Sequence, residues 1–328
     1  MRPHERADRM TKVTTATPRG ECPTWLAFLS DVTGGDAELM NYLQRMVGYC
    51  LTGDTSEHAL FFLYGTGANG KSVFVNVIAT ILGDYAANAP MDTFMETRSD
   101  RHPTDLAGLR GARFVASIET EQGRRWNESK IKTITGGDKI SARFMRQDFF
   151  DYTPSFKLLI AGNHKPSIRN VDEAMKRRLH LIPFTVTIPL DRRDGKLTEK
   201  LLAERDGILA WAQAGCLMWQ RVGLTRPQSV LDATDEYFEA EDAMGRWIQE
   251  RCVLASNATA LTFELFGDWK QWAESNGEFL GSMRRFSDAL LTRRFEKWRA
   301  TGGMRGFVGI SLKEPARIPQ SSYPYNDQ

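Results

Sequence analysis

The segment FFLYGTGANGKS, residues 61–72, restricts the fold of this 328-residue chain more than any other stretch. It contains the pattern G-x-x-x-x-G-K-[ST] between an apolar run and the helical pattern KSVFVNVIATIL. Glycines in this pattern let successive backbone N–H groups turn toward a phosphate, and the N-terminus of the following helix adds positive potential. We predict a phosphate-binding loop in an α/β fold, with a Gly-rich structural turn as the alternative. The predicted contact residues are Gly65, Thr66, Gly67, Ala68, Asn69, Gly70, Lys71, Ser72 and Val73.

Short apolar runs that alternate with helical patterns predict a sheet around this loop. Runs of this length, apolar at nearly every position, are typical of strands that helices cover on both faces. The sequence therefore predicts a central, mostly parallel sheet of the α/β class. The predicted strands span residues 60–64, 113–118, 157–161 and 179–184.

The segments outside the sheet predict further modules. The stretch PTWLAFLSDVTGGDAELMNYLQRMVGYCLTG gives two amphipathic helices, with a turn at Gly34 and Asp36 as the N-cap of the second helix. Near the other end, two helical patterns followed by the glycine-broken stretch ATGGMRGFVGISL outline a winged helix. The predicted organisation is a flexible tail (1–20), an N-terminal helical module (21–54), a P-loop ATPase core (55–190), a helical region (191–250), a winged-helix-like DNA-binding domain (251–316) and a tail (317–328).

The composition is that of an ordinary globular chain, with 41% hydrophobic and 26% charged residues. The net charge of +2 gives no overall basic field, so a nucleic-acid surface has to be sought in local patches. The four cysteines form no CxxC pair, which disfavours zinc and disulfide frameworks and suits a reducing compartment. No apolar run approaches the length of a membrane span, and MRPHERADRMTK lacks the apolar core of a secretory signal. We expect an intracellular protein without a membrane partner.

Two acidic residues follow the predicted strand RFVASI. Glu119 and Glu121 are two positions apart, so an extended backbone points both side chains to one face. Nucleotide hydrolysis needs a carboxylate beside a magnesium ion and another beside the attacking water. We assign Glu119 and the Ser72 hydroxyl to Mg²⁺ and Glu121 to the water, while Lys71 contacts the β- and γ-phosphates. An exposed acidic strand end is the alternative for the two acids.

Asn163 ends the predicted strand FKLLIAG, and Arg177 and Arg178 precede the last strand. A neutral amide beside a γ-phosphate orients water or reports which nucleotide is bound, although asparagine is also a common turn residue. Either arginine is a candidate for a guanidinium that a neighbouring subunit supplies to the transferring phosphoryl group. A solvated face is the alternative for this pair.

The stretch GDKISARFMRQDFFDYTP, residues 137–154, predicts a β-hairpin that projects from the sheet. Its first half carries Lys139, Arg143 and Arg146 with Phe144 among them. Basic side chains follow phosphates and aromatic rings stack on bases, a combination typical of sequence-tolerant binding to single strands. We predict that these four residues contact DNA, and a hairpin whose charges face solvent is the alternative.

The order of these motifs resembles the superfamily-3 helicases, in particular the C-terminal helicase part of phage and plasmid primase-helicases, a group that includes the poxvirus type. The resemblance runs from about residue 23 to residue 312 and rests on CPTWLAFL, GTGANGKS, KTITGGDKISARF and MKRRLHLIPF. It implies a modified AAA+ fold that assembles as a ring, usually hexameric. Such a ring uses ATP and Mg²⁺ to move 3′ to 5′ along single-stranded or forked DNA. A primase domain or protein often accompanies it, and a bacterial cytoplasm is the expected location.

The resemblance also implies individual roles. The Walker A lysine and hydroxyl fall on Lys71 and Ser72, the Walker B acids on Glu119 and Glu121, the sensor asparagine on Asn163, and the arginine finger on Arg178, with Arg177 as second choice. Arg146 falls near the tip of the hairpin that grips DNA in the central channel. The broader superfamily commonly has adjacent acids, whereas Thr120 separates them here. The division of labour between the two acids therefore stays open.

A rival function of another class is an ATP-regulated DNA-binding or assembly module without unwinding activity. Its function would lie in the C-terminal module, where GSMRRFSDALLTRRFEKWR carries six cations against two acids. Such an excess suits either a duplex backbone or a solvated helix face. A P-loop kinase or GTPase is disfavoured by the hairpin and by the absence of the guanine-reading N-K-x-D pattern.

Overall fold

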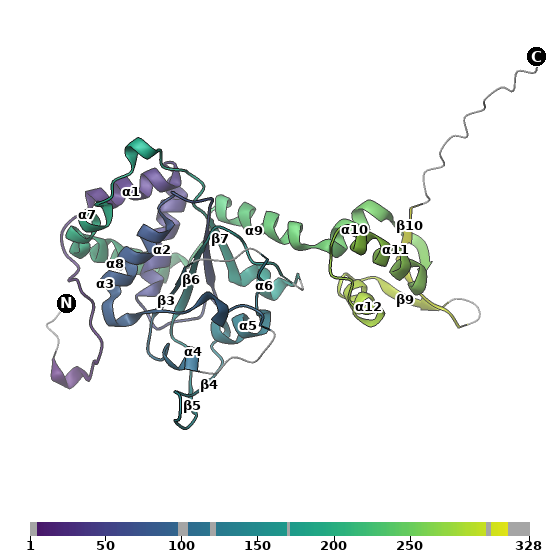
Figure 1. The fold of residues 1–328 in the computed structure, drawn as a ribbon, viewed down its shortest axis with the longest axis horizontal. Coiled ribbons are helices and arrows are strands. Elements are labelled where there is room, and N and C mark those ends of the chain that lie inside the picture. Colours follow the sequence, from purple (N-terminus) through teal and green to yellow (C-terminus); the bar gives the residue numbers. More distant parts are fainter. Residues whose placement is uncertain (1–4, 98–103, 119–122, 169–170, 300–302, 314–328) are drawn as a thin grey trace, which may run out of the picture. The chain divides into compact units, whose positions relative to one another are not determined.

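The computed structural model describes residues 5–97, 104–118, 123–168, 171–299 and 303–313. The chain divides into two compact units, Met1–Glu241 and Asp242–Gln328, and each unit has its own hydrophobic core (Figure 1). The first unit contains the phosphate-binding loop and the sheet beside it.

Five strands of the first unit form a parallel sheet in the order β2-β3-β6-β1-β7. Leu60 of β1 lies opposite Leu158 of β6 on one side and Leu179 of β7 on the other. The predicted α/β class with a mostly parallel sheet is confirmed. The sequence missed β2, because three residues without an apolar run give no strand pattern. The strands are β1 (Leu60–Tyr64), β2 (Ala86–Asn88), β3 (Phe114–Ile118), β6 (Lys157–Gly162) and β7 (Leu179–Pro183).

Helices cover both faces of this sheet (Figure 1). Along β1, Phe61 and Leu63 enter one core and Leu60 and Phe62 enter the other, because successive side chains of a strand point to opposite faces. The first core includes α1 (Pro23–Thr33), α2 (Ala37–Cys50), α3 (Lys71–Leu82), α7 (Leu197–Ala203) and α8 (Arg205–Val222). The second includes α4 (Thr104–Ala107), α5 (Glu128–Gly136), α6 (Glu173–Arg178) and α9 (Gln228–Glu241). Short 3₁₀ turns span Arg6–Asp8, Gly83–Tyr85, Met91–Thr93 and Leu190–Arg192.

The two N-terminal helices form as the sequence predicts. Gly34 ends α1 in the left-handed region, with φ +63°, and the Asp36 side chain accepts a 2.9 Å hydrogen bond from the Leu39 backbone N–H at the start of α2. These two residues turn the chain between the helices. Both helices then pack on the face of the sheet that also carries α3.

Two cations from the sheet hold the carboxyl end of α2. Arg113 donates a 2.6 Å hydrogen bond to the Leu51 carbonyl, and Lys157 donates to the carbonyls of Thr52 and, at 3.1 Å, Asp54. Lys157 is 2% exposed, and burial lowers the pKa of its ammonium group to about 8. Cations are favourable at a helix C-terminus, where carbonyl groups lack helical partners. The helical module and the sheet are therefore joined by polar contacts as well as by the core.

The predicted hairpin is present as β4 (Ile140–Ala142) and β5 (Phe150–Tyr152), which pair antiparallel as a separate two-stranded sheet. It follows α5 directly and extends away from the central sheet (Figure 1). The Tyr152 hydroxyl, which donates to the Leu106 carbonyl at 2.5 Å, ties its base to the rest of the unit.

The described residues of the second unit form three helices and an antiparallel sheet in the order β8-β10-β9. Its elements are α10 (Ala243–Arg251), β8 (Cys252–Leu261), α11 (Thr262–Ser275), α12 (Met283–Thr292), β9 (Glu296–Arg299) and β10 (Arg305–Leu312). The predicted succession of two helices and a strand pair is present as α11, α12, β9 and β10. The sequence missed β8, whose first half is largely exposed and lacks an alternating pattern. The assignment to the winged-helix class stays a prediction.

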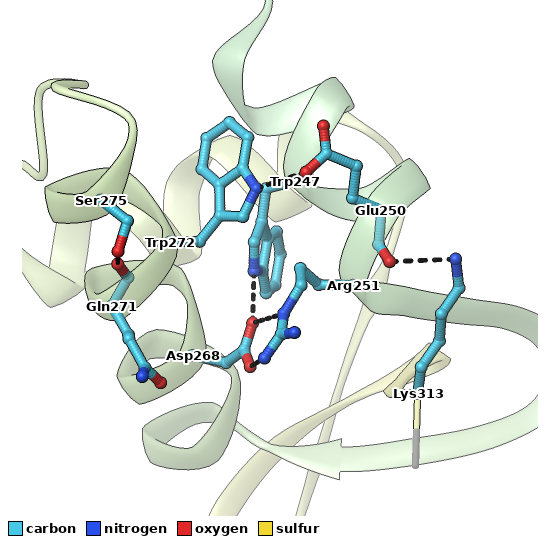
Figure 2. Close-up of polar contacts among 8 residues, drawn as sticks. All are labelled: Trp247, Glu250, Arg251, Asp268, Gln271, Trp272, Ser275 and Lys313. Atoms are coloured by element: carbon cyan, nitrogen blue, oxygen red, sulfur yellow. Dashed lines mark hydrogen bonds and ion pairs between the residues drawn. The ribbon is translucent and has the colours of Figure 1, made fainter. Parts of the chain in front are cut away.

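Asp268 is the central acceptor of a polar cluster in this unit (Figure 2). Its carboxylate accepts a 2.8 Å hydrogen bond from Trp247 and forms a 2.6 Å ion pair with Arg251. Glu250 accepts a 2.7 Å hydrogen bond from Trp272, which joins α10 to α11 a second time. The two tryptophans are 0% and 7% exposed, which confirms that they pack in a core. This cluster sets the position of α10 against α11.

Replacing Asp268 with alanine should lower the free energy of unfolding of this unit by about 2 kcal/mol, because the buried Trp247 N–H loses its acceptor.

Burial alone would raise the pKa of Asp268, but the hydrogen bonds from Arg251 and Trp247 outweigh it and hold the pKa below its ordinary value. The contribution is therefore present at neutral pH and is lost as pH falls through the folded-state pKa. Thermal unfolding followed by tryptophan fluorescence measures both effects. Glu274→Ala, which removes an exposed ion pair with Lys270, is the control and should change little; an equal effect of the two variants would contradict the assignment.

Candidate functional site

The predicted phosphate-binding loop lies between β1 and α3 and is tightly curled. Gly67, Ala68 and Gly70 all adopt left-handed φ values, of +110°, +50° and +80°. Gly65 has no room for a side chain, since a Cβ atom there would lie 2.0 Å from the Phe184 carbonyl oxygen. The curl directs the loop toward the N-terminus of α3, the arrangement that binds phosphate through backbone N–H groups.

Helix α1 packs against the loop at Gly70. A Cβ atom on Gly70 would lie 2.6 Å from Cγ1 of Val32 and 2.9 Å from Cε2 of Phe28. A side chain at position 70 would therefore collide with α1 in addition to straining the left-handed backbone. The N-terminal helices thus fix the position of the loop.

Lys71 is the buried cation of the site. Its side chain is 6% exposed, and burial lowers the pKa of its ammonium group. The Nζ atom donates hydrogen bonds of 2.8 Å to the Gly65 carbonyl, 2.8 Å to Oδ1 of Asn69 and 3.2 Å to Oδ1 of Asn163. All three acceptors are neutral, so the charge has no carboxylate partner among these contacts. Phosphate oxygens would supply negative charge at this position, so the loop has the chemistry to hold a phosphate group.

Asn69 has a structural role that the sequence did not indicate. Its Nδ2 atom donates a 2.7 Å hydrogen bond to the Phe184 carbonyl beyond β7, while its Oδ1 atom accepts from Lys71. The side chain is 3% exposed. The amide therefore connects the loop lysine to the end of β7. Only the position of Asn69 within the glycine-rich pattern could have drawn attention to it.

Two sequence-predicted residues, Lys71 and Asn163, meet at the carboxyl edge of the sheet. Asn163 follows β6, which lies between β1 and β3. Ligands of parallel α/β sheets bind at this edge, near the point where the strand order reverses. Glu119 and Glu121 lie outside the described residues, and β3 ends immediately before them at Ile118, opposite Ala161 of β6. The roles of the two acids stay predictions.

The arginines lie at the other edge of the same sheet. Arg177 and Arg178 end α6 directly before β7, and the first residue of β7 lies opposite Leu60, the first residue of β1. The length of β1, about 15 Å, therefore separates them from the loop that follows it. Neither arginine is placed to reach the loop of its own chain.

The two arginines differ in their surroundings. Arg178 donates hydrogen bonds of 3.2 Å to the Thr135 hydroxyl on α5 and 2.9 Å to the Ala174 carbonyl on its own helix. Burial, followed by the charge of Arg177, lowers the pKa of Arg178. Arg177 is exposed. Exposure makes Arg177 the better candidate to reach a second chain, and the choice between the two stays a prediction.

The β4–β5 hairpin presents its candidate DNA contacts at its tip. Arg146 lies in the turn with a left-handed φ of +61°, and Phe144 is 41% exposed. Arg143 is half-buried, with its guanidinium 4.6 Å from the ring centroid of Phe149. Lys139 is exposed at the base, directly before β4. The structure thus places three of the predicted residues at or beside the tip and one at the base.

Two further exposed side chains belong to this tip and were missed. Met145 and Phe149 are 71% and 58% exposed. Met145 lies between Phe144 and Arg146 in the chain, and Phe149 directly precedes β5. Exposed apolar side chains at a loop tip are unusual unless they contact a partner. The aromatic pair in QDFFDY, beside the basic residues, was the available signal.

The described residues contain no group of three or more histidine, cysteine or acidic side chains that could hold a metal ion. Of the predicted magnesium ligands, Ser72 is exposed in the first turn of α3 and Glu119 lies outside the described residues. Within the described parts of the chain, no helix is long and apolar enough to span a membrane.

A family model described as a family of unknown function, DUF5906, matches residues 63–178. The match begins in β1 and ends with α6, so it includes the loop, Asn163, the hairpin and both arginines.

Curated viral proteins are similar over most of the chain. "Putative helicase L207/L206" of Acanthamoeba polyphaga mimivirus is 27% identical over 74% of this chain, and "Putative helicase 022R" of Frog virus 3 is 26% identical over 81%. "Putative primase C962R" of African swine fever virus is 21% identical over 67%. The aligned regions cover only 27%, 29% and 25% of these three proteins, so the chain spans about a quarter of their length.

A solved structure shares the fold. The apo structure of the C-terminal region of NrS-1 has a TM-score of 0.54 and 11% identity, and the match covers 90% of this chain and 78% of that one. The predicted resemblance to primase-helicases is therefore confirmed by the relatives named as helicases and primases, and the solved structure confirms the fold. The relatives named here are viral, and the expectation of a bacterial host stays a prediction.

Proposed function

We propose that this chain is the ATP-driven motor of a DNA helicase that works in replication as a ring of identical subunits. The relatives named as helicases and primases support the replication role. The loop, whose Lys71 is hydrogen-bonded to neutral oxygens among the described residues, supports ATP as the energy source. We take the ring to be hexameric and its direction to be 3′ to 5′ from the resemblance to superfamily-3 helicases.

The observation that carries the proposal is the position of the loop and of the arginines at opposite edges of one sheet. A site that needs both can be completed only when the arginine edge of one subunit faces the loop of the next. Such head-to-tail contacts repeat around a closed ring. The guanidinium from the neighbour would then stabilise the charge on the transferring γ-phosphoryl group.

Helix α5 connects the arginine edge of the ATP site to the hairpin that would bind DNA. Its Thr135 hydroxyl accepts a hydrogen bond from Arg178, and the hairpin begins four residues after this helix ends at Gly136. Movement of the arginine edge when a phosphate is bound or released would therefore displace the base of the hairpin. The exposed Phe144, Phe149 and Arg146 at the tip have the chemistry to hold a single strand.

One relative that this chain matches over part of its length supports a primase as a further partner. The matched part is 25% of a protein named as a primase. We propose that the motor acts together with a primase domain or a separate primase protein.

The experiment is the rate of ATP hydrolysis with and without single-stranded DNA, for the wild type and for Arg146→Ala. We expect strong stimulation of the wild type and its loss in the variant, with basal turnover unchanged within about twofold because Arg146 lies away from the ATP site. Arg221→Ala, which removes an exposed charge on α8, is the control and should keep the stimulation. Turnover that ignores DNA in a confirmed oligomer would contradict the motor and favour the assembly module.

A further inference from the structure

Three exposed cations gather on the β9–β10 strand pair of the second unit. Lys297 and Arg299 lie on β9 and Arg305 begins β10. No ion pair involves any of them among the described residues. Other arginines of this unit are paired, namely Arg246 with Glu278, Arg251 with Asp268 and Arg293 with Asp242. Unlike these three arginines, the β9–β10 cations are not neutralised by an ion pair among the described residues.

The register of the sheet brings two of these cations face to face. Arg299 lies directly opposite Arg305 in the antiparallel pair, so both side chains leave the same face of the sheet. Lys297 is two residues from Arg299 on β9 and shares that face. Like charges directly opposite each other destabilise a sheet. An anion bound between the two guanidinium groups would remove this repulsion.

Packing contacts hold the strand pair on the rest of the unit. Trp298 lies opposite Gly306, and a Cβ atom on that glycine would lie 2.9 Å from Cε3 of the indole, so the ring covers the glycine. Phe307, the next residue of β10, is 1% exposed and anchors the pair in the core. Figure 1 shows β9 and β10 extending past the helices of this unit.

The chemistry of this surface differs from that of the hairpin tip in the first unit. The β4–β5 tip combines a cation with exposed Phe144 and Phe149. The β9–β10 pair carries exposed cations, while its Trp298 ring lies over Gly306 and its Phe307 ring is buried in the core. Stacking on bases is typical of single-strand binding, whereas a surface with cations and no exposed aromatic ring suits the phosphates of an intact duplex.

We infer that the β9–β10 pair binds the sugar–phosphate backbone of duplex DNA through Lys297, Arg299 and Arg305. The inference rests on the proposed function only in taking DNA as the partner, since it requires no hydrolysis. It assigns the second unit to the duplex and the hairpin of the first unit to the single strand, the two forms of DNA that meet at a fork.

The test measures binding of the full chain to a short fluorescent duplex and to a single strand, without nucleotide, across a range of salt concentrations. Arg299→Gln combined with Arg305→Gln should weaken duplex binding about tenfold at low salt and reduce the salt slope by about two. Single-strand binding should stay within about twofold. The control, Arg6→Gln with Arg221→Gln, removes two exposed charges from the first unit and should leave duplex binding unchanged.

Stability distinguishes a binding role from a structural one. The double glutamine variant should melt at the same temperature as the wild type or higher, because it removes a repulsion, and Arg299→Lys with Arg305→Lys should keep duplex binding. Unchanged duplex affinity and slope in the glutamine variant would overturn the inference and leave an acidic protein as the partner for this surface. Equal losses for duplex and single strand would also overturn it. Absence of ATP turnover in the wild type would defeat the proposed motor but not this result.

Discussion

Lys71→Ala should reduce ATP turnover about a hundredfold or more. The Lys71 ammonium is buried at the loop, and within the described parts of the chain its hydrogen bonds, of 2.8–3.2 Å, go to neutral oxygens. Phosphate oxygens would replace these acceptors when ATP binds, and the charge then acts on the transferring group in surroundings of low dielectric. Removal of the ammonium takes away that charge and leaves the acceptors on Gly65 and Asn69 without a donor.

Steady-state hydrolysis measures the loss of turnover, and titration with a fluorescent ATP analogue measures the loss of nucleotide affinity. Affinity for the nucleotide should fall about tenfold or more, since a charge-assisted hydrogen bond is lost. Lys200→Ala removes an exposed lysine that pairs with Asp194 and should change neither quantity. Near wild-type turnover in Lys71→Ala would show that this loop is not the catalytic phosphate site.

Arg177→Ala should lower turnover about a thousandfold while leaving ATP affinity nearly unchanged. The reason is its position, since the length of β1 separates Arg177 from the loop of its own chain and its side chain is exposed. Arg178→Ala tests the other candidate and removes the contacts with Thr135 and Ala174, so it should also disturb the packing of α5 against α6. A melting temperature lowered only in Arg178→Ala would separate the supporting arginine from the catalytic one.

Mixing two inactive variants tests the in-trans role. Where a chain with Lys71→Ala supplies its intact Arg177 to the loop of a chain with Arg177→Ala, the interface is complete. An equal mixture should therefore regain about a quarter of wild-type turnover if subunits exchange at random in a head-to-tail ring. No recovery in mixed rings, or loss of ATP binding in Arg177→Ala alone, would contradict the assignment.

The strands that the sequence predicted are those in which consecutive residues are buried. The strands LFFLY and KLLIAG are covered on both faces, so apolar residues occupy nearly every position and the pattern is visible without a structure. Asp36 and Gly34 were predictable as caps because their backbone roles depend on residue type. In contrast, β8 and β2 are partly exposed and depend on pairing with distant strands, which no local pattern records.

The site was predictable where spacing within one segment determines geometry, as in the loop from Gly65 to Ser72. The contact between Lys71 and Asn163 joins residues 92 positions apart and follows from the strand order, which brings β6 beside β1. The role of Asn69 depends on the Phe184 carbonyl, another distant group. The separation of the arginines from the loop likewise depends on the register of the sheet. The three-dimensional structure is needed to see that the arginines lie at one edge of the sheet and the loop at the other.

The most direct test of the motor is strand displacement from a forked DNA substrate with a labelled strand, in the presence of hydrolysable ATP. We expect the wild type to displace the strand only when it hydrolyses ATP, and we expect no displacement by Lys71→Ala. A wild-type protein that binds the fork and hydrolyses ATP without displacing the strand would contradict the account, and would leave an ATP-regulated assembly module in its place.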